Sequence, residues 1–330
     1  MVDRDILQFV PNIEPLEGHA TGYPTGIFVT PDVIGLVGEG TTRQFRDDAH
    51  VYDERYTVLN EWAKIALDRC VQFHPTFDLG LVENILDIGC GSGNATFSLR
   101  KVFPNAQIFA TDISPDMVAI LVERAQLLGL SENIIPFISN AEKVQLAPES
   151  FDLIFGSSMI HHLIEPDKFL DQIFSSLKRG GICLFTEPFK VGHQVLRFFL
   201  SEFSSPSVYS KTIPEDIRKF FKSYIFTIDA MCTLDRSGID YTELDDKWMF
   251  SRRFFEDAGR RNKVSLDFFT TDEPDNRFTA NIERLVWLGL GKKWVLPEPA
   301  RSLVHRFDEA ITKDVMDEIP STGCIIFKKE

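Results

Sequence analysis

The sequence predicts an α/β protein in which a mostly parallel sheet has helices on both faces and carries an inserted helical cap. Two features of the pattern support this fold class. From about Asn84 to Glu187, short runs rich in Ile, Leu and Phe alternate with amphipathic stretches, as they do in parallel sheets buried by helices on both faces. After Pro188 the alternation stops, and a Phe-rich stretch of about sixty residues follows before it resumes.

The regular part of the pattern predicts five strands joined by helices. The strands are expected at Asn84–Ile88, Gln107–Thr111, Asn133–Ile138, Asp152–Gly156 and Gly181–Thr186. The helices are expected near Ser92–Val102, Pro115–Leu128 and Pro166–Leu177. The second helix has the clearest start, because Ser114 suits the N-cap and Pro115 suits the first helical position.

The rest of the chain predicts more helices and two further strands. A helix in SRRFFEDAGRRNKVSLDFF is expected to lead into a strand at Val264–Phe269, and STGCIIFKK is expected as an edge strand. Within the cap, one helical face carries Ile217, Phe220, Phe221, Tyr224, Ile228 and Met231. An N-terminal helix is predicted from the spacing of Tyr52, Tyr56, Leu59, Ala63, Ala66 and Cys70. The expected divisions are an N-terminal lid (1–80), a core (81–188), a cap (189–247) and the remaining core (248–330) with a second helical excursion at about 271–320.

Composition and charge narrow the classes of function. The formal net charge is −14, with 49 acidic against 35 basic residues, which argues against binding that relies on a phosphate backbone, so nucleic acid is not the expected partner. The N-terminus lacks a signal-peptide pattern and no uncharged run approaches a membrane span, so we expect a soluble, cytoplasmic protein. The five cysteines are scattered without a CxxC pair, which predicts reduced thiols and no metal site.

The segment ILDIGCGSGN, from Ile85 to Asn94, carries the first chemical signal. Asp87 lies near the end of a strand, Gly89, Gly91 and Gly93 form a turn, and Asn94 begins a helix. Backbone amides in such a turn point at whatever lies above the carboxyl end of the strand. The glycines alone are also compatible with a tight turn that only serves packing.

Three later segments add to this signal. IFATDISPDMV ends the second strand in Asp112, 23 residues after Gly89, where a carboxylate can accept both hydroxyls of a ribose. FISNAEKVQL places Asn140, Ala141 and Glu142 after the third strand, where they could meet the edge of an adenine. FDLIFGSSMIHHL and LKRGGICLFTEP supply the fourth and fifth strands. Four strand ends therefore converge on one crevice.

Together these motifs resemble those of class I S-adenosylmethionine-dependent methyltransferases of the small-molecule type. The resemblance covers about Asn84 to Pro188, more weakly through Phe269, and rests above all on ILDIGCGSGN and SSLKRGG. It implies a Rossmann-like, seven-stranded, mostly parallel sheet. It also implies S-adenosylmethionine as cofactor and S-adenosylhomocysteine as product.

The resemblance further implies roles for individual residues. Asp87 and the loop formed by Gly89, Cys90, Gly91 and Gly93 would meet the methionine part of the cofactor. Asp112 would hold the ribose, and Ser157 would lie beside the sulfonium. The adenine would lie among Ile113, Met117 and Ala141, with Asn140 or Glu142 at its exocyclic amine. Tyr52 and Tyr56 are candidate lid residues, with simple core packing as the alternative.

A proton acceptor is needed only if the methyl acceptor must lose a proton. MIHHL supplies His161 and His162 as candidate general bases, although one of such a pair often only packs. Glu187 of LFTEP is expected within reach of His161, and certain small-molecule O-methyltransferases of similar sequence use a histidine and an acidic residue at these two places. His193, Arg43 and Arg46 are weaker candidates for contacts to acceptor or cofactor.

The leading functional hypothesis is methyl transfer to O, N or C of a small, apolar or aromatic metabolite, because the cap is rich in Phe. Two alternatives stay open. One is an enzyme of the same fold that uses the cofactor for cyclisation, decarboxylation or rearrangement, and the other is a catalytically silent binding protein. The sequence does not indicate an oligomeric state.

Overall fold

The computed structural model describes residues 4–18, 22–36, 62–232, 240, 244–272 and 276–330. These form two compact units. The first comprises the described residues up to Thr186 together with Phe255–Asp267 and Ile325–Glu330, and the second comprises the described parts of Glu187–Phe254 and Phe268–Cys324. The cap predicted at 189–247 and the excursion predicted at 271–320 both fall in the second unit.

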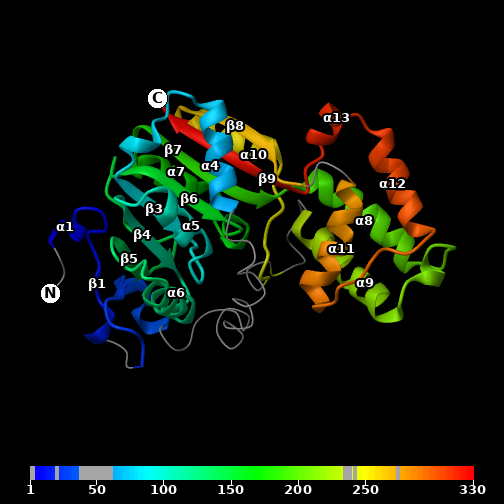
Figure 1. The fold of residues 1–330 in the computed structure, drawn as a ribbon, viewed down its shortest axis with the longest axis horizontal. Coiled ribbons are helices and arrows are strands. Elements are labelled where there is room, and N and C mark those ends of the chain that lie inside the picture. The colour runs from blue at the N-terminus through cyan, green and yellow to red at the C-terminus, as the bar shows by residue number, and fades with distance from the viewer. Residues whose placement is uncertain (1–3, 19–21, 37–61, 233–239, 241–243, 273–275) are drawn as a thin grey trace. The chain divides into compact units, whose positions relative to one another are not determined.

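A nine-stranded sheet with the order β1-β2-β5-β4-β3-β6-β7-β9-β8 organises the first unit (Figure 1). Its strands are β1 (Glu14–Pro15), β2 (Phe28–Val29), β3 (Asn84–Ile88), β4 (Gln107–Asp112), β5 (Ile134–Ile138), β6 (Phe151–Ser157), β7 (Leu177–Pro188), β8 (Val264–Thr270) and β9 (Thr322–Lys329). The predicted α/β class and mostly parallel sheet are confirmed. The two strands beyond the predicted seven are two-residue segments, of which β2 pairs in parallel with β5.

The chain reverses its direction across the sheet between β3 and β6. From β3 it moves outward to β4 and β5, and then returns to place β6 on the other side of β3, followed by β7. Because crossovers between parallel strands are right-handed, α5 (Asn94–Val102) and α6 (Pro115–Leu128) lie on the opposite face from α7 (Pro166–Ser176). Ligands bind at such a reversal, outside the carboxyl ends of the strands.

Helix α6 shows how local signals fix an element. The Ser114 side chain accepts a hydrogen bond from the Met117 N–H at 3.3 Å, Pro115 begins the helix, and Gly129 ends it in the left-handed conformation. The helix therefore has the predicted bounds. Its inner face packs Val118, Leu121 and Ala125 into a core shared with β5 and the N-terminal segment.

The prediction for the last strand was wrong in one respect. β9 is not an edge strand, because it lies between β7 and β8, and β8 forms the edge. The burial of consecutive residues explains this position: Gly323 to Phe327 are all buried, whereas β8 is mostly half-exposed. A continuous apolar run such as CIIF is typical of a strand covered on both faces.

The remaining helices of the first unit include α1 (Arg4–Leu7), α4 (Trp62–Phe73) and α10 (Arg252–Asn262). Arg261 of α10 pairs with Asp167 of α7 at 2.7 Å, which places these two helices side by side. Of the predicted N-terminal helix, only the part from Trp62 onward lies within the described residues. Tyr52, Tyr56, Arg43 and Arg46 lie outside them.

Helices of the second unit surround an aromatic core of their own. They are α8 (Lys190–Ser204), α9 (Glu215–Cys232), α11 (Arg277–Leu290), α12 (Ala300–Ala310) and α13 (Lys313–Asp317). Phe199 lies among Phe203, Phe278 and Phe307, with ring centroids 5.4 to 6.2 Å away. The helical face predicted for α9 is confirmed, because Ile217, Phe221, Ile228 and Met231 are buried. Four of the seven phenylalanines in 189–247, namely Phe199, Phe203, Phe220 and Phe221, therefore belong to this core.

Candidate functional site

The glycine loop between β3 and α5 closes onto the end of β4. The Gly91 N–H donates to Asp112 Oδ2 at 2.9 Å, and the Ser114 N–H donates to Asp112 Oδ1 at 2.9 Å. The Cys90 N–H donates to the Thr111 carbonyl at 2.9 Å. The first and second motifs of the sequence are thus joined by direct hydrogen bonds at adjacent strand ends.

The loop glycines serve different purposes. Gly89 has φ of 70°, and a Cβ there would lie 2.6 Å from Met159 Cβ, so this position needs glycine for packing. Gly91 has φ of 50°, in the left-handed region that favours glycine, and a Cβ there would meet no atom of the described residues within 4 Å. The turn, and not close packing against those residues, therefore requires glycine at this position.

Asp87 lies at the end of β3 and is buried. Its Oδ2 accepts a hydrogen bond from Thr96 Oγ1 of α5 at 2.5 Å. Burial raises the pKa of Asp87 to about 7, the Thr96 hydrogen bond opposes this rise, and the charge of Asp112 adds to it. Burial also raises the pKa of Asp112, although the N–H groups of Ser114 and Gly91 lower it.

Neither carboxylate forms a salt bridge with any residue that the structure describes. The buried Asp87 carboxylate and the half-buried Asp112 carboxylate, without a cation among the described residues, favour a positively charged ligand, because such a ligand would offset the desolvation cost of Asp87. Asp112 also keeps lone pairs beyond those used by its backbone partners Ser114, Gly91 and Ile113, so it can accept hydroxyl groups. This donor set fits a cationic nucleoside.

Side chains after β4 and β5 border the same strand ends. Ile113 follows Asp112 and is 38% exposed, whereas Met117 of α6 is buried in the core at 1% exposure. Ile113 can therefore cover a flat apolar ligand directly. Met117 contributes through packing in this structure.

The NAE segment after β5 forms a tight turn. Asn140 Oδ1 accepts from the Glu142 N–H at 2.9 Å, and Glu142 Oε1 accepts from the Glu165 N–H at 2.6 Å. Ala141 between them is half-buried. Each side chain keeps further hydrogen-bonding capacity for a ligand edge.

The thiol of Cys90 is buried, and burial raises its pKa well above the ordinary value, with the charges of Asp87 and Asp112 acting in the same direction. It is therefore protonated at neutral pH. A thiol in this state is a weak nucleophile.

The fourth strand ends beside the fifth. Ser157 pairs in register with Thr186, and the Ser158 N–H donates to the Thr186 carbonyl at 2.8 Å. His161 and His162 follow in a short 3₁₀ helix, Ile160–His162, with ring centroids 4.1 Å apart. His161 is buried and His162 is half-buried.

The other predicted residues lie in the second unit. Glu187 is fully buried, and its pairing with His161 stays a prediction. His193 is buried, and its Nδ1 lies 2.9 Å from the Phe189 carbonyl, one turn earlier. This contact supports a local structural role for His193.

The sequence did not reveal one residue that supports the loop. Arg124 of α6 donates from Nη1 to the Ser92 carbonyl at 3.0 Å, to Ser92 Oγ at 3.2 Å and to Asn94 Oδ1 at 3.2 Å. Its guanidinium also lies 5.1 Å from the centroid of the Phe97 ring. Arg124 therefore fixes both the glycine loop and the start of α5.

Comparison with known proteins agrees with this geometry. Residues 82–243 match the family described as "Methyltransferase domain". The chain is 30% identical over 179 residues to malonyl-[acyl-carrier protein] O-methyltransferase 2 of Ilyobacter polytropus, covering 54% of this chain and 65% of the relative. It is 28% identical over 153 residues to the ubiquinone/menaquinone biosynthesis C-methyltransferase UbiE of Pseudoalteromonas translucida, covering 46% and 61%.

A solved structure shares the fold. Phosphoethanolamine N-methyltransferase 2 of Haemonchus contortus, in complex with S-adenosyl-L-methionine, matches with a TM-score of 0.50 and 17% identity, covering 86% of this chain and 60% of that one. The chain thus spans less than two thirds of the length of each of these relatives. The motifs, the strand order and the family match together identify the Rossmann-like core of this chain as a class I S-adenosylmethionine-dependent methyltransferase domain.

Proposed function

We propose that the chain transfers the methyl group of S-adenosylmethionine to a small, apolar or aromatic acceptor. The observation that carries the proposal is the closure of the glycine loop on Asp112 beside Asp87, with neither carboxylate paired to a cation among the described residues. The relatives named as O-, C- and N-methyltransferases support the reaction class. They act on different acceptors, so the acceptor must be argued from this chain.

In this proposal, different residues contact different parts of the cofactor. Asp112 holds the ribose hydroxyls, and the amides of the loop from Gly89 to Gly93 face the methionine part. Ile113 and Ala141 flank the adenine, and Asn140 or Glu142 meets its amine. When bound, S-adenosylmethionine supplies a methyl group activated by the positive charge of its sulfur.

The protein's own residues then position the acceptor and exclude water, which supply most of the acceleration in such a displacement. For an acceptor that must lose a proton, His161 is the proposed base and Glu187 is the proposed group that orients it. Ser157 borders the sulfur. The two inserted regions, 189–247 and 271–320, and the N-terminal helix are the proposed source of acceptor specificity, because the strand ends are committed to the cofactor.

Calorimetric titration tests the cofactor first. S-adenosylmethionine is expected to bind with one site per chain, NAD is expected not to bind, and Asp112→Asn is expected to weaken binding at least tenfold. Asp116→Asn is the matched control, because this carboxylate lies four residues on and faces Tyr23 at 3.4 Å. Absence of S-adenosylmethionine binding in the unmodified chain would refute the proposal.

The reaction itself is tested with methyl-labelled S-adenosylmethionine and a panel of aromatic and aliphatic hydroxy, amino and carboxylic acids. Label is expected in an organic extract, together with stoichiometric S-adenosylhomocysteine. Consumption of acceptor without a gain in mass of one methyl group would instead favour cyclisation or rearrangement. Among the described residues, no helix is long and apolar enough to cross a bilayer.

A further inference from the structure

Two buried hydroxyl groups meet where β4 and β5 end. Thr111 Oγ1 and Ser139 Oγ lie 2.7 Å apart, so one hydroxyl donates a hydrogen bond to the other. The two residues are 1% and 2% exposed. Thr111 immediately precedes Asp112, and Ser139 immediately precedes Asn140. The pair therefore joins the two segments that would hold the ribose and the adenine of the cofactor.

The hydroxyl pair extends the contact between β4 and β5 beyond their paired residues. Thr111 pairs in register with Phe137, and Asp112 pairs with Ile138, the last residue of β5. Because side chains alternate along a strand, Ser139 lies on the same face as Phe137 and so meets Thr111. The Ser139 N–H also donates to the Asp112 carbonyl at 3.1 Å. Ser139 is thus the point at which the chain leaves the sheet.

The segments on either side of the pair have hydrogen bonds of their own. The Asn140 carbonyl accepts from the Lys143 N–H at 2.9 Å and from the Val144 N–H at 2.8 Å, which closes the NAE turn (residues 140–142) on itself. The Thr111 carbonyl accepts from the Cys90 N–H at 2.9 Å. Thr111 is therefore bonded to the glycine loop through its backbone and to the start of the NAE turn through its side chain.

A short strand from the N-terminal segment holds the end of β5 from its other side. β2 pairs in parallel with β5 through Val29 and Ile138. Just beyond β2, the Thr30 N–H donates to the Ile138 carbonyl at 3.0 Å, and the Thr30 hydroxyl lies 3.4 Å from the same oxygen. The end of β5 is therefore fixed by both of its neighbouring strands.

Folding alone does not favour two hydroxyl groups at this place. Phe137 and Ile138, which directly precede Ser139, are fully buried. Replacement of a buried hydrogen-bonded pair by two apolar groups of the same shape is nearly neutral or even stabilising. A hydroxyl pair adds a defined distance and direction between the two strand ends. Binding sites depend on such definition, because a site that is about 1 Å too loose fails.

We propose that Thr111 and Ser139 form a positioning pair, which sets the NAE turn relative to Asp112 and thereby makes the chain selective for the 6-amino group of adenine. The inference rests on the proposed function, in which Asp112 holds the ribose and Asn140 or Glu142 meets the amine. Neither hydroxyl contacts the cofactor. Preorganised segments keep both contacts available at once, whereas without the pair the ribose contact stays and the contact to the amine weakens.

Calorimetric titration with S-adenosylhomocysteine and with its 6-oxo analogue, S-inosylhomocysteine, measures this selectivity. The unmodified chain is expected to prefer the amino ligand by about fivefold or more, which is what one hydrogen bond contributes. Thr111→Val and Ser139→Ala are each expected to reduce the preference below about twofold, mainly by weakening the amino ligand. Thr111→Ser keeps a hydroxyl and should retain the preference. The double variant should be as selective as either single variant, because the pair acts as a unit.

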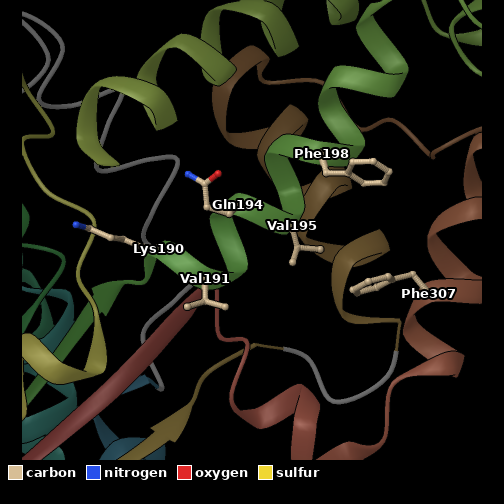
Figure 2. A pocket seen from close by; sticks show the side chains of 6 residues that line it. All are labelled: Lys190, Val191, Gln194, Val195, Phe198 and Phe307. Atoms are coloured by element: carbon tan, nitrogen blue, oxygen red, sulfur yellow. The ribbon is translucent and has the colours of Figure 1, made fainter. Parts of the chain in front are cut away.

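Two control variants separate positioning from general effects. Ser176→Ala removes another buried hydroxyl, which donates to the Ile173 carbonyl at 2.9 Å in α7, and it should lower stability without changing the preference. In the second unit, an apolar groove is lined in part by Val191, Val195, Phe198 and Phe307 (Figure 2). Phe198→Ser should leave the preference unchanged, because the proposed cofactor residues belong to the first unit.

Urea titrations verify that each variant folds. The double variant is expected to be at least as stable as either single variant, because it leaves no hydroxyl of the pair without its partner. If the unmodified chain binds neither ligand, the proposed function fails and this inference fails with it. If the unmodified chain binds S-adenosylhomocysteine selectively and both single variants keep that preference, only the positioning role is overturned. Equal binding of the two ligands by the unmodified chain also overturns it.

Discussion

Thr96 Oγ1 donates a hydrogen bond to Asp87 Oδ2 at 2.5 Å, and this contact ties the end of β3 to the first turn of α5. Asp87 precedes the glycine loop in the sequence and Thr96 follows it, so this hydrogen bond connects the two ends of the loop. Because the pKa of Asp87 is raised to about 7, the charge of this carboxyl group changes near neutral pH.

Affinity for a cationic cofactor should therefore depend on pH. Above about pH 7 Asp87 is a carboxylate and attracts the ligand, and below it the group is neutral. We expect the dissociation constant of S-adenosylmethionine to rise several-fold between pH 8 and pH 6, measured by calorimetry. Asp87→Asn should bind more weakly at pH 8 and show a flatter pH profile, and an unchanged profile in this variant would contradict the assignment.

The raised pKa of Asp87 also predicts how the stability of the ligand-free protein depends on pH. In the unfolded chain Asp87 has an ordinary pKa near 4, so the folded state binds more protons than the unfolded state between about pH 4 and 7. The contribution of this group to stability is present below pH 4, declines as the pH rises and is lost above 7. Relative to Asp87→Asn, the unmodified protein should lose a few kcal/mol of unfolding free energy between about pH 4 and pH 7, as measured by urea titrations.

Substitutions of two loop glycines should have different consequences. Gly89→Ala places a Cβ 2.6 Å from Met159 and should cost about 2 kcal/mol or more of folding free energy. Gly91→Ala costs about 1 kcal/mol for its left-handed backbone, but its methyl group occupies the open space. We expect a lower melting temperature for the first and a loss of cofactor binding in a folded protein for the second. If Gly89→Ala and Gly91→Ala lose the same stability and both still bind S-adenosylmethionine, Gly91 has only a structural role.

Removal of the Arg124 guanidinium should loosen the loop. Arg124→Met keeps the aliphatic stem but deletes the hydrogen bonds to Ser92 and Asn94. Their loss should lower the free energy of unfolding by about 1–2 kcal/mol. Weaker S-adenosylmethionine binding is expected in the same variant. Arg179→Met is the control, because this side chain is 82% exposed and should change neither stability nor binding.

The histidine pair can be separated by kinetics. If the acceptor loses a proton, His161→Ala should lower kcat by about 10²- to 10⁴-fold without changing the affinity for S-adenosylmethionine, and His162→Ala should act less strongly. Glu187→Gln should lower kcat and alter its pH profile, as expected for a positioning residue. His305→Ala, on the surface of α12, is the control. Full activity of both histidine variants would show that neither is the base.

Local signals explain how much of the fold was predictable. β3 and α6 have the predicted bounds, because both carry local end signals. A polar residue precedes the apolar run of β3 and a glycine turn follows it, and α6 has Ser114, Pro115 and Gly129 at its ends. β7 begins at Leu177 and not at Gly181, because pairing with β6 resumes across a register shift. Such a shift depends on the partner strand, which the local sequence does not contain.

In the candidate site, too, local signals were predictable and contacts that depend on distant residues were not. Gly91 and Asp112 were predicted to border one crevice, because strand ends of a parallel sheet share one edge. The structure joins the two residues by a hydrogen bond that was not predicted, and their roles toward the cofactor stay predictions. Thr96 and Arg124 were not recognised, because one is an ordinary helical threonine and the other reaches Ser92 from 32 residues away. Their roles depend on how two helices pack, and no short motif records that packing.

The place of β9 in the sheet has a consequence for synthesis. At about 5–20 residues per second, the ribosome adds the stretch between β7 and β9 over roughly ten seconds, and during that interval the outer edge of β7 lacks its neighbour. An unpaired edge invites association with other chains. Removal of residues 322–329 would make this exposure permanent, so a shortened chain should aggregate where single substitutions at the surface do not.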